Sequence, residues 1–76
     1  MTIYTLEEQH QGARSIFGIA DSEKNWLKLM DTHFGKFQIL NQYPGSLPHI
    51  KKLYILRVSG STINVIIKQF TLNSYK

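Results

Sequence analysis

The clearest periodic pattern in the chain lies between Ser22 and Phe34, where apolar side chains recur at helical spacing. At about 100° per residue they share one continuous arc, and polar side chains fill the opposite arc. The apolar arc holds Trp26, Leu27, Leu29, Met30, His33 and Phe34. Asp21 or Ser22 can cap the first turn, and Gly35 stands where a left-handed residue commonly ends a helix. The pattern predicts an amphipathic helix over residues 22–34 that lies on a flat surface.

Two runs rich in β-branched and aromatic residues predict a terminal β-hairpin over Lys52–Val58 and Thr62–Leu72. If Gly60-Ser61 forms a type II′ turn, Val58 faces Ile63 and Leu53 faces Lys68. One face of this hairpin is then apolar apart from a phenol, so we expect the helix to cover it. That face carries Tyr54, Leu56, Val58, Ile63, Val65 and Ile67.

The rest of the chain supplies three weaker strand patterns. Residues 2–6 and 15–20 are compatible with a hairpin around Gln11-Gly12, and residues 36–43 alternate in part. Pro44-Gly45 and Pro48 then predict an irregular connection. We therefore expect an α+β fold in the order ββαβββ, with a single helix packed on one face of an antiparallel sheet. No repeat or linker interrupts residues 1–76, which predicts a single domain.

Composition restricts the environment and the partners. The chain has 42% hydrophobic residues and no cysteine, and no apolar run is long enough for a signal peptide or a membrane span. We expect a folded cytoplasmic protein with no membrane association. All five acidic residues lie in positions 1–31, whereas positions 32–76 carry six basic residues and no acid, for a net charge of +4. This asymmetry favours an anionic partner.

The residue types that perform chemistry are scattered. His10, His33 and His49 fall on three different predicted elements without the spacing of a zinc site. His33 lies on the apolar arc of the helix, so we expect a boundary imidazole there. Glu7 and Glu8 are adjacent in a strand, so their side chains should point to opposite faces. We expect no enzymatic activity, no metal and no cofactor.

The second face of the terminal hairpin is the most informative surface, because the only predicted helix covers the first. It mixes apolar and basic residues, a pattern typical of interaction sites. We expect the contact set to be Leu53, Ile55, Arg57, Ile66, Lys68 and Phe70, with Lys51 and Asn64 beside them. The acidic residues are expected mainly on the other side. The alternatives are that the N-terminal strands or the 44–50 connection fold across this face, or that it is ordinary exposed strand surface.

The opening of the chain, Thr2-Ile-Tyr-Thr-Leu-Glu-Glu-Gln-His-Gln-Gly-Ala-Arg followed by Ile16-Phe-Gly-Ile-Ala-Asp-Ser, resembles small accessory proteins encoded by bacteriophages. The similarity covers about the first 22 residues and contains no catalytic motif. It implies a protein that binds a component of the host cell, in the host cytoplasm.

Three functions stay open at this point. The second face binds and inhibits a host protein or defence component; or it binds nucleic acid; or it pairs with itself in a homodimer that encloses a small anionic ligand. Against nucleic acid, we expect one aromatic residue on that face, Phe70, where sheet-based binders present two or three. We expect reversal of the charges of Arg57 and Lys68 to abolish partner binding without affecting folding.

Overall fold

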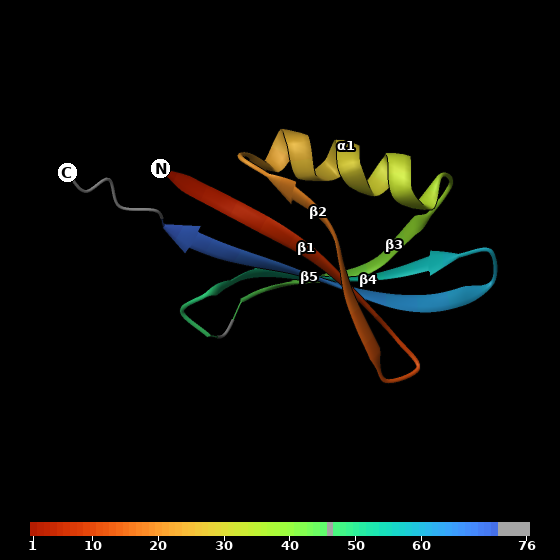
Figure 1. Ribbon diagram of the computed structural model, residues 1–76. Helices are drawn as coiled ribbons and strands as arrows, with labels where there is room; N and C mark the ends of the chain where they lie inside the picture. Colours follow the sequence, from red (N-terminus) through yellow and green to blue (C-terminus); the bar gives the residue numbers. More distant parts are fainter. Residues whose placement is uncertain (46, 72–76) are drawn as a thin grey trace.

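The computed structural model describes residues 1–45 and 47–71, which form one helix and one five-stranded antiparallel sheet. In chain order the elements are β1 (Thr2–His10), β2 (Ala13–Ala20), α1 (Glu23–Phe34), β3 (Gln38–Pro44), β4 (Ile50–Val58) and β5 (Ser61–Thr71). The strand order across the sheet is β2-β1-β5-β4-β3, and α1 lies on one side of it (Figure 1). The predicted α+β fold and the order ββαβββ are confirmed.

Helix α1 begins and ends where the local sequence predicts. The Ser22 hydroxyl accepts a hydrogen bond from the backbone N–H of Asn25 at 3.3 Å, and Ser22 is the N-cap. At the other end Gly35 has φ 71° and donates its N–H to the Asp31 carbonyl at 2.9 Å. A left-handed glycine at this position satisfies a carbonyl of the last turn without a Cβ penalty.

Both tight hairpin turns have two central residues with positive φ. Gln11 and Gly12 join β1 to β2 with φ 54° and 83°, and Ser59 and Gly60 join β4 to β5 with φ 50° and 82°. Positive φ at both positions is the signature of a type I′ turn, whose twist suits the flanking strands.

The predicted turn at Gly60-Ser61 is therefore wrong by one residue. The pairing places Val58 opposite Ser61 and Leu53 opposite Ile66, not opposite Lys68. Each partner moves by two positions, and side chains alternate with a period of two. Residues 52–58 and 61–70 of the hairpin consequently keep the face that alternation predicts for them.

The sheet is bent by three irregularities in its pairing. Phe17 in β2, Leu40 in β3 and Lys51 in β4 are each passed over where the register shifts. An extra residue of this kind bends and twists its strand. As Figure 1 shows, the β1–β2 turn extends to the side of the sheet away from α1.

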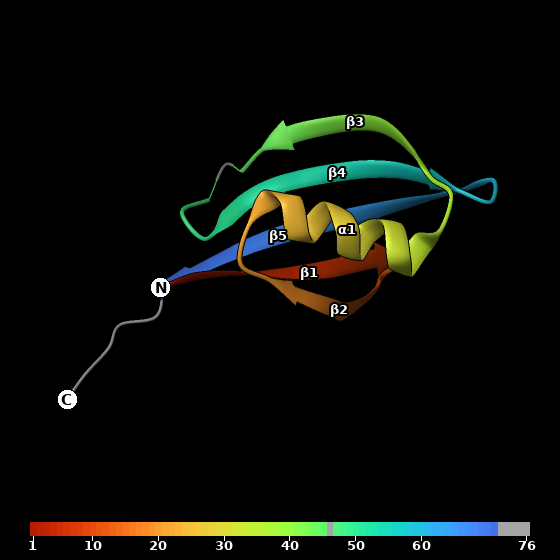
Figure 2. The ribbon, with the colours of Figure 1, turned by 90° about the horizontal axis from the view of Figure 1, so that it is seen from above.

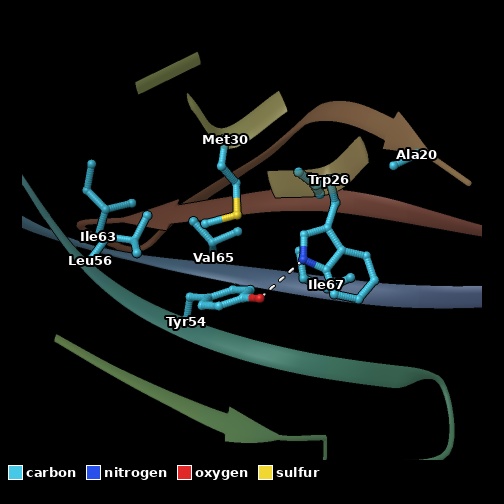
Figure 3. Packing of buried hydrophobic residues seen from close by; sticks show 9 residues of the cluster. Ala20, Trp26, Met30, Tyr54, Leu56, Ile63, Val65 and Ile67 are labelled. Carbon is cyan, nitrogen blue, oxygen red and sulfur yellow. Dashed lines mark hydrogen bonds between the residues drawn. The ribbon is translucent and has the colours of Figure 1, made fainter. Parts of the chain in front are cut away.

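The core lies between α1 and the sheet. Trp26 and Met30 of α1 are buried, and they pack with buried side chains of the sheet (Figure 3). The sheet contributes Leu6, Ala20, Tyr54, Leu56, Ile63, Val65 and Ile67. Inside this layer the Trp26 indole N–H donates to the Tyr54 hydroxyl at 3.2 Å, so neither polar atom is left without a partner. Four of the six residues predicted for the helix-covered face are completely buried or nearly so: Tyr54, Leu56, Val65 and Ile67.

Candidate protein-binding face

We call the side of the sheet away from α1 the open face, because no described element covers it (Figure 1). The six predicted contact residues, Leu53, Ile55, Arg57, Ile66, Lys68 and Phe70, all alternate onto this side. Leu53 and Ile66 are directly opposite one another at its centre. Arg57 pairs with Thr62, so it lies eight positions along β5 from Phe70, or roughly 26 Å at the usual strand rise. The six residues form a band rather than a compact site.

A groove of about 380 Å³ runs across the middle of the open face. Leu53 and Ile66 lie in its lining, together with Ile50 of β4 and Asn64 of β5. Tyr43, Pro44 and Gly45 line it from the end of β3, and Gln9 lines it from β1. Ile66 is only 8% exposed, whereas Tyr43 is 44% exposed. The groove therefore joins a well-packed apolar residue to an accessible aromatic residue.

Within residues 1–45 and 47–71, no other segment folds across this face. β1 and β2 continue the sheet beyond β5, and the β3–β4 connection borders the groove. Gly45 is needed at this border, because a Cβ there would fall on the carbonyl group of Ile50.

Glu7 of β1 is a buried acid on the open face. It pairs with Ile66 of β5, and its side chain is 8% exposed. One carboxylate oxygen lies 3.1 Å from the Lys68 ammonium, and the other lies 3.8 Å from Arg14 Nη1. The Lys68 side chain is 27% exposed and the Arg14 side chain 56%. The expectation that the acids lie mainly on the other side is wrong for Glu7, because β1 inserts beside β5 and brings its carboxylate to Lys68.

The predicted divergence of the two adjacent glutamates is confirmed. Glu8 lies on the helix side, where its carboxylate is 2.6 Å from His33 Nε2. The His33 ring also stacks on Phe17 with centroids 4.2 Å apart. His33 therefore has the boundary position that the helical pattern predicts. Among residues 1–45 and 47–71, no three His, Cys, Asp or Glu side chains gather closely enough to hold a metal ion.

The two lysines that precede Leu53 do not join the band. The bulge passes over Lys51, so the expectation that Lys51 lies beside the contact set is wrong. Lys52 lies on the helix side, with its ammonium 3.7 Å from the Glu23 carboxylate and 5.5 Å from the Tyr54 ring centroid.

Other residues also lie on the open face, and the sequence did not identify them as contacts. They include Glu7, Arg14, Tyr43 and Ile50. Tyr43 reaches this face because it pairs with Leu53 after the bulge at Leu40. Unbroken alternation would place Tyr43 on the same face as Ile39, which pairs with Leu56 on the helix side. The bulge at Leu40 is what moves Tyr43 to the open face.

Tyr43 is a second exposed aromatic residue on the open face, so the expectation of a single one is corrected. Tyr43 and Phe70 are 44% and 42% exposed. Two strands and four positions along β5 separate them, which is roughly 16 Å at standard sheet spacings. Two adjacent stacked bases could not contact both rings.

No protein-family model, curated protein or solved structure matches the chain. In the described part of the chain, no helix combines the length and the apolar character that crossing a bilayer requires.

Proposed function

We propose that this protein is a non-catalytic binding protein whose open face docks onto a partner protein and blocks it. The observation that carries the proposal is the groove over Leu53 and Ile66, which is apolar at its centre and has charged side chains beside it. Specific interfaces combine a desolvated apolar centre with a polar rim, and Arg and Tyr are common anchors in them. The resemblance of the opening residues to bacteriophage accessory proteins supports a host protein or defence component as the target.

The charges of the open face indicate the chemistry of the partner. Arg14, Arg57 and Lys68 are the basic side chains that alternate onto it, and Glu7 is buried against two of them. The accessible charge is therefore positive around an apolar groove. A partner that inserts an apolar side chain and surrounds it with carboxylates would be complementary to both features.

The spacing of Tyr43 and Phe70 makes nucleic acid the weaker candidate. Single strands are held by aromatic rings that stack successive bases along a basic groove. Two aromatic residues whose strand positions are roughly 16 Å apart do not provide such a continuous platform. The apolar side chains between them, Leu53 and Ile66, also give no hydrogen bonds to bases.

The test uses two variants with matched chemistry on opposite sides of the molecule. Tyr43→Ala with Arg57→Glu removes an exposed apolar group and reverses a charge on the open face. Leu27→Ala with Lys24→Glu makes the same changes on α1, where Leu27 is 37% exposed and Lys24 is also exposed. Reversal of Lys68 is no longer suitable, since it would place a carboxylate beside the buried Glu7.

Each variant serves as bait in host lysate with and without nuclease treatment, and captured proteins are quantified and then tested as purified partners by titration calorimetry. We expect the wild type and the α1 variant to bind the same protein, and the open-face variant to lose at least about tenfold in affinity. Equal binding by all three would refute the assignment of the open face. Loss of capture on nuclease treatment would favour the nucleic-acid alternative.

A further inference from the structure

β3 is the least protected element of the described chain. It pairs with β4 on one side, and within residues 1–45 and 47–71 no strand lies on the other. All seven of its residues are exposed, whereas every other strand has at least one buried residue. Figure 2 shows α1 extending over the middle of the sheet and leaving β3 clear of it. The outer backbone groups of β3 and both of its faces are thus open to another chain.

The sequence of β3 lacks the usual protection of an edge strand. Natural edges are commonly guarded by charged side chains, above all lysine. Gln38–Pro44 contains no charged residue, although the chain as a whole carries +4. Its large apolar side chains Ile39, Leu40 and Tyr43 are each about 40% exposed. The only protective features are the bulge at Leu40 and the terminal Pro44.

The polar side chains of β3 are all amides, namely Gln38, Asn41 and Gln42. An amide carries both donors and an acceptor, so it can hydrogen-bond to an identical amide. A neutral strand of this composition is compatible with its own copy, whereas a strand with one type of charge would repel it.

We propose that β3 pairs antiparallel with β3 of a second copy of this chain, across a two-fold axis perpendicular to the sheet, to form one continuous sheet. Such an interface is isologous and closes at two copies. The opposite edge differs in charge, because β2 carries Arg14 whereas β3 has no charged residue. This arrangement does not depend on the binding partner proposed above. It would place both open faces on the same side and both helices on the other.

The bulge and Pro44 restrict the pairing to a few residues, so the buried area falls at the small end of specific interfaces, below about 1,200 Å². We therefore expect a reversible dimer in the micromolar range or weaker. Sedimentation equilibrium on the full chain, at protein concentrations from about 10 µM to about 1 mM, spans the dissociation constants expected for such a dimer.

Two single substitutions test which edge is used. Asn41→Lys places like charges across the two-fold axis and should weaken the dimer at least tenfold. Ser15→Lys adds the same charge on the β2 edge, where Ser15 is also exposed, and should leave the dimer unchanged. Circular dichroism of both variants checks that the fold is retained.

A distance measurement identifies the interface directly. The chain has no cysteine, so one introduced cysteine carries one spin label. At standard strand spacings, labels at Gln38→Cys should lie within about 25 Å of each other, and labels at Ser15→Cys roughly 40 Å apart. Sedimentation as a monomer up to about 1 mM would overturn the proposal. The proposal would also be overturned by a dimer that is as stable with Asn41→Lys as without it. A separation well above about 25 Å between the spin labels at Gln38→Cys would overturn it too.

Discussion

Replacing Lys68 by methionine removes the closest partner of a buried carboxylate while keeping an unbranched side chain. Glu7 Oε1 lies 3.1 Å from the Lys68 ammonium, and the Glu7 side chain is 8% exposed. In Lys68→Met, Arg14 remains 3.8 Å away, but its side chain is 56% exposed. A pair of that kind contributes about 0–1 kcal/mol.

The expected cost follows from the burial of the two groups. Breaking a fully buried pair costs about 3–5 kcal/mol, because one charge is left without compensation. The Lys68 side chain is 27% exposed, so water reaches the ion pair, and the expected cost is smaller than for a fully buried pair. We expect a loss of about 2 kcal/mol in the free energy of unfolding. With a urea dependence of about 1 kcal/mol/M, the midpoint should fall by about 2 M.

The double substitution Glu7→Leu with Lys68→Met is the informative control. It removes both charges and leaves an apolar pair beside Ile66, which is the residue opposite Glu7. Replacing a buried pair by apolar residues is often neutral or stabilising, so the double variant should lie within about 1 kcal/mol of the wild type.

Urea unfolding followed by tryptophan fluorescence measures all three proteins, since Trp26 is the only tryptophan and is 2% exposed. If the double variant is less stable than Lys68→Met alone, the reasoning is refuted. If Lys68→Met matches the wild type, the ion pair makes no contribution and the burial of Glu7 has another cause.

Two further predictions concern the core and a turn. Tyr54→Phe leaves the buried Trp26 indole N–H without its acceptor and should cost about 1–2 kcal/mol in urea unfolding. Tyr43→Phe removes a phenol hydroxyl from an exposed residue and should have little effect on stability. Equal losses of stability in the two variants would contradict a stabilising hydrogen bond between Trp26 and Tyr54. Ser59→Asn should stabilise the β4–β5 hairpin by about 0.5 kcal/mol, because type I′ turns favour Asn-Gly, and should raise the calorimetric melting temperature by about 2–4 °C. A lower melting temperature would contradict the type I′ turn.

Local signals in the sequence predicted the elements that depend on neighbouring residues. The helix was found at both ends because Ser22 and Gly35 act through backbone groups within one turn of themselves. The last hairpin was found, but its register was not. Ser59-Gly60 and Gly60-Ser61 both contain the glycine that a tight turn requires, and the sequence alone does not show that Ser59 adopts positive φ.

The open face was predicted only as far as the last hairpin extends. Leu53 and Ile66 were placed on it correctly, because alternation within a strand determines the face. Glu7 and Tyr43 were missed, because their positions depend on β1 lying beside β5 and β3 beside β4. Strand order is a property of tertiary packing, and no residue in either strand specifies it alone. The charge pattern along the chain therefore overstated the basic character of this face.

The central place of β5 in the sheet has a consequence for how the chain folds. β5 follows every other element in the chain, yet it lies between β1 and β4 and supplies Ile63, Val65 and Ile67 to the core. Its pairing with β1 joins Thr2 to Thr71, almost the full length of the sequence. Contacts between residues so far apart in the sequence have a high entropic cost of loop closure, and they therefore slow folding. On the ribosome, β1, β2 and α1 would therefore lack their central strand until residues 61–71 have been synthesised.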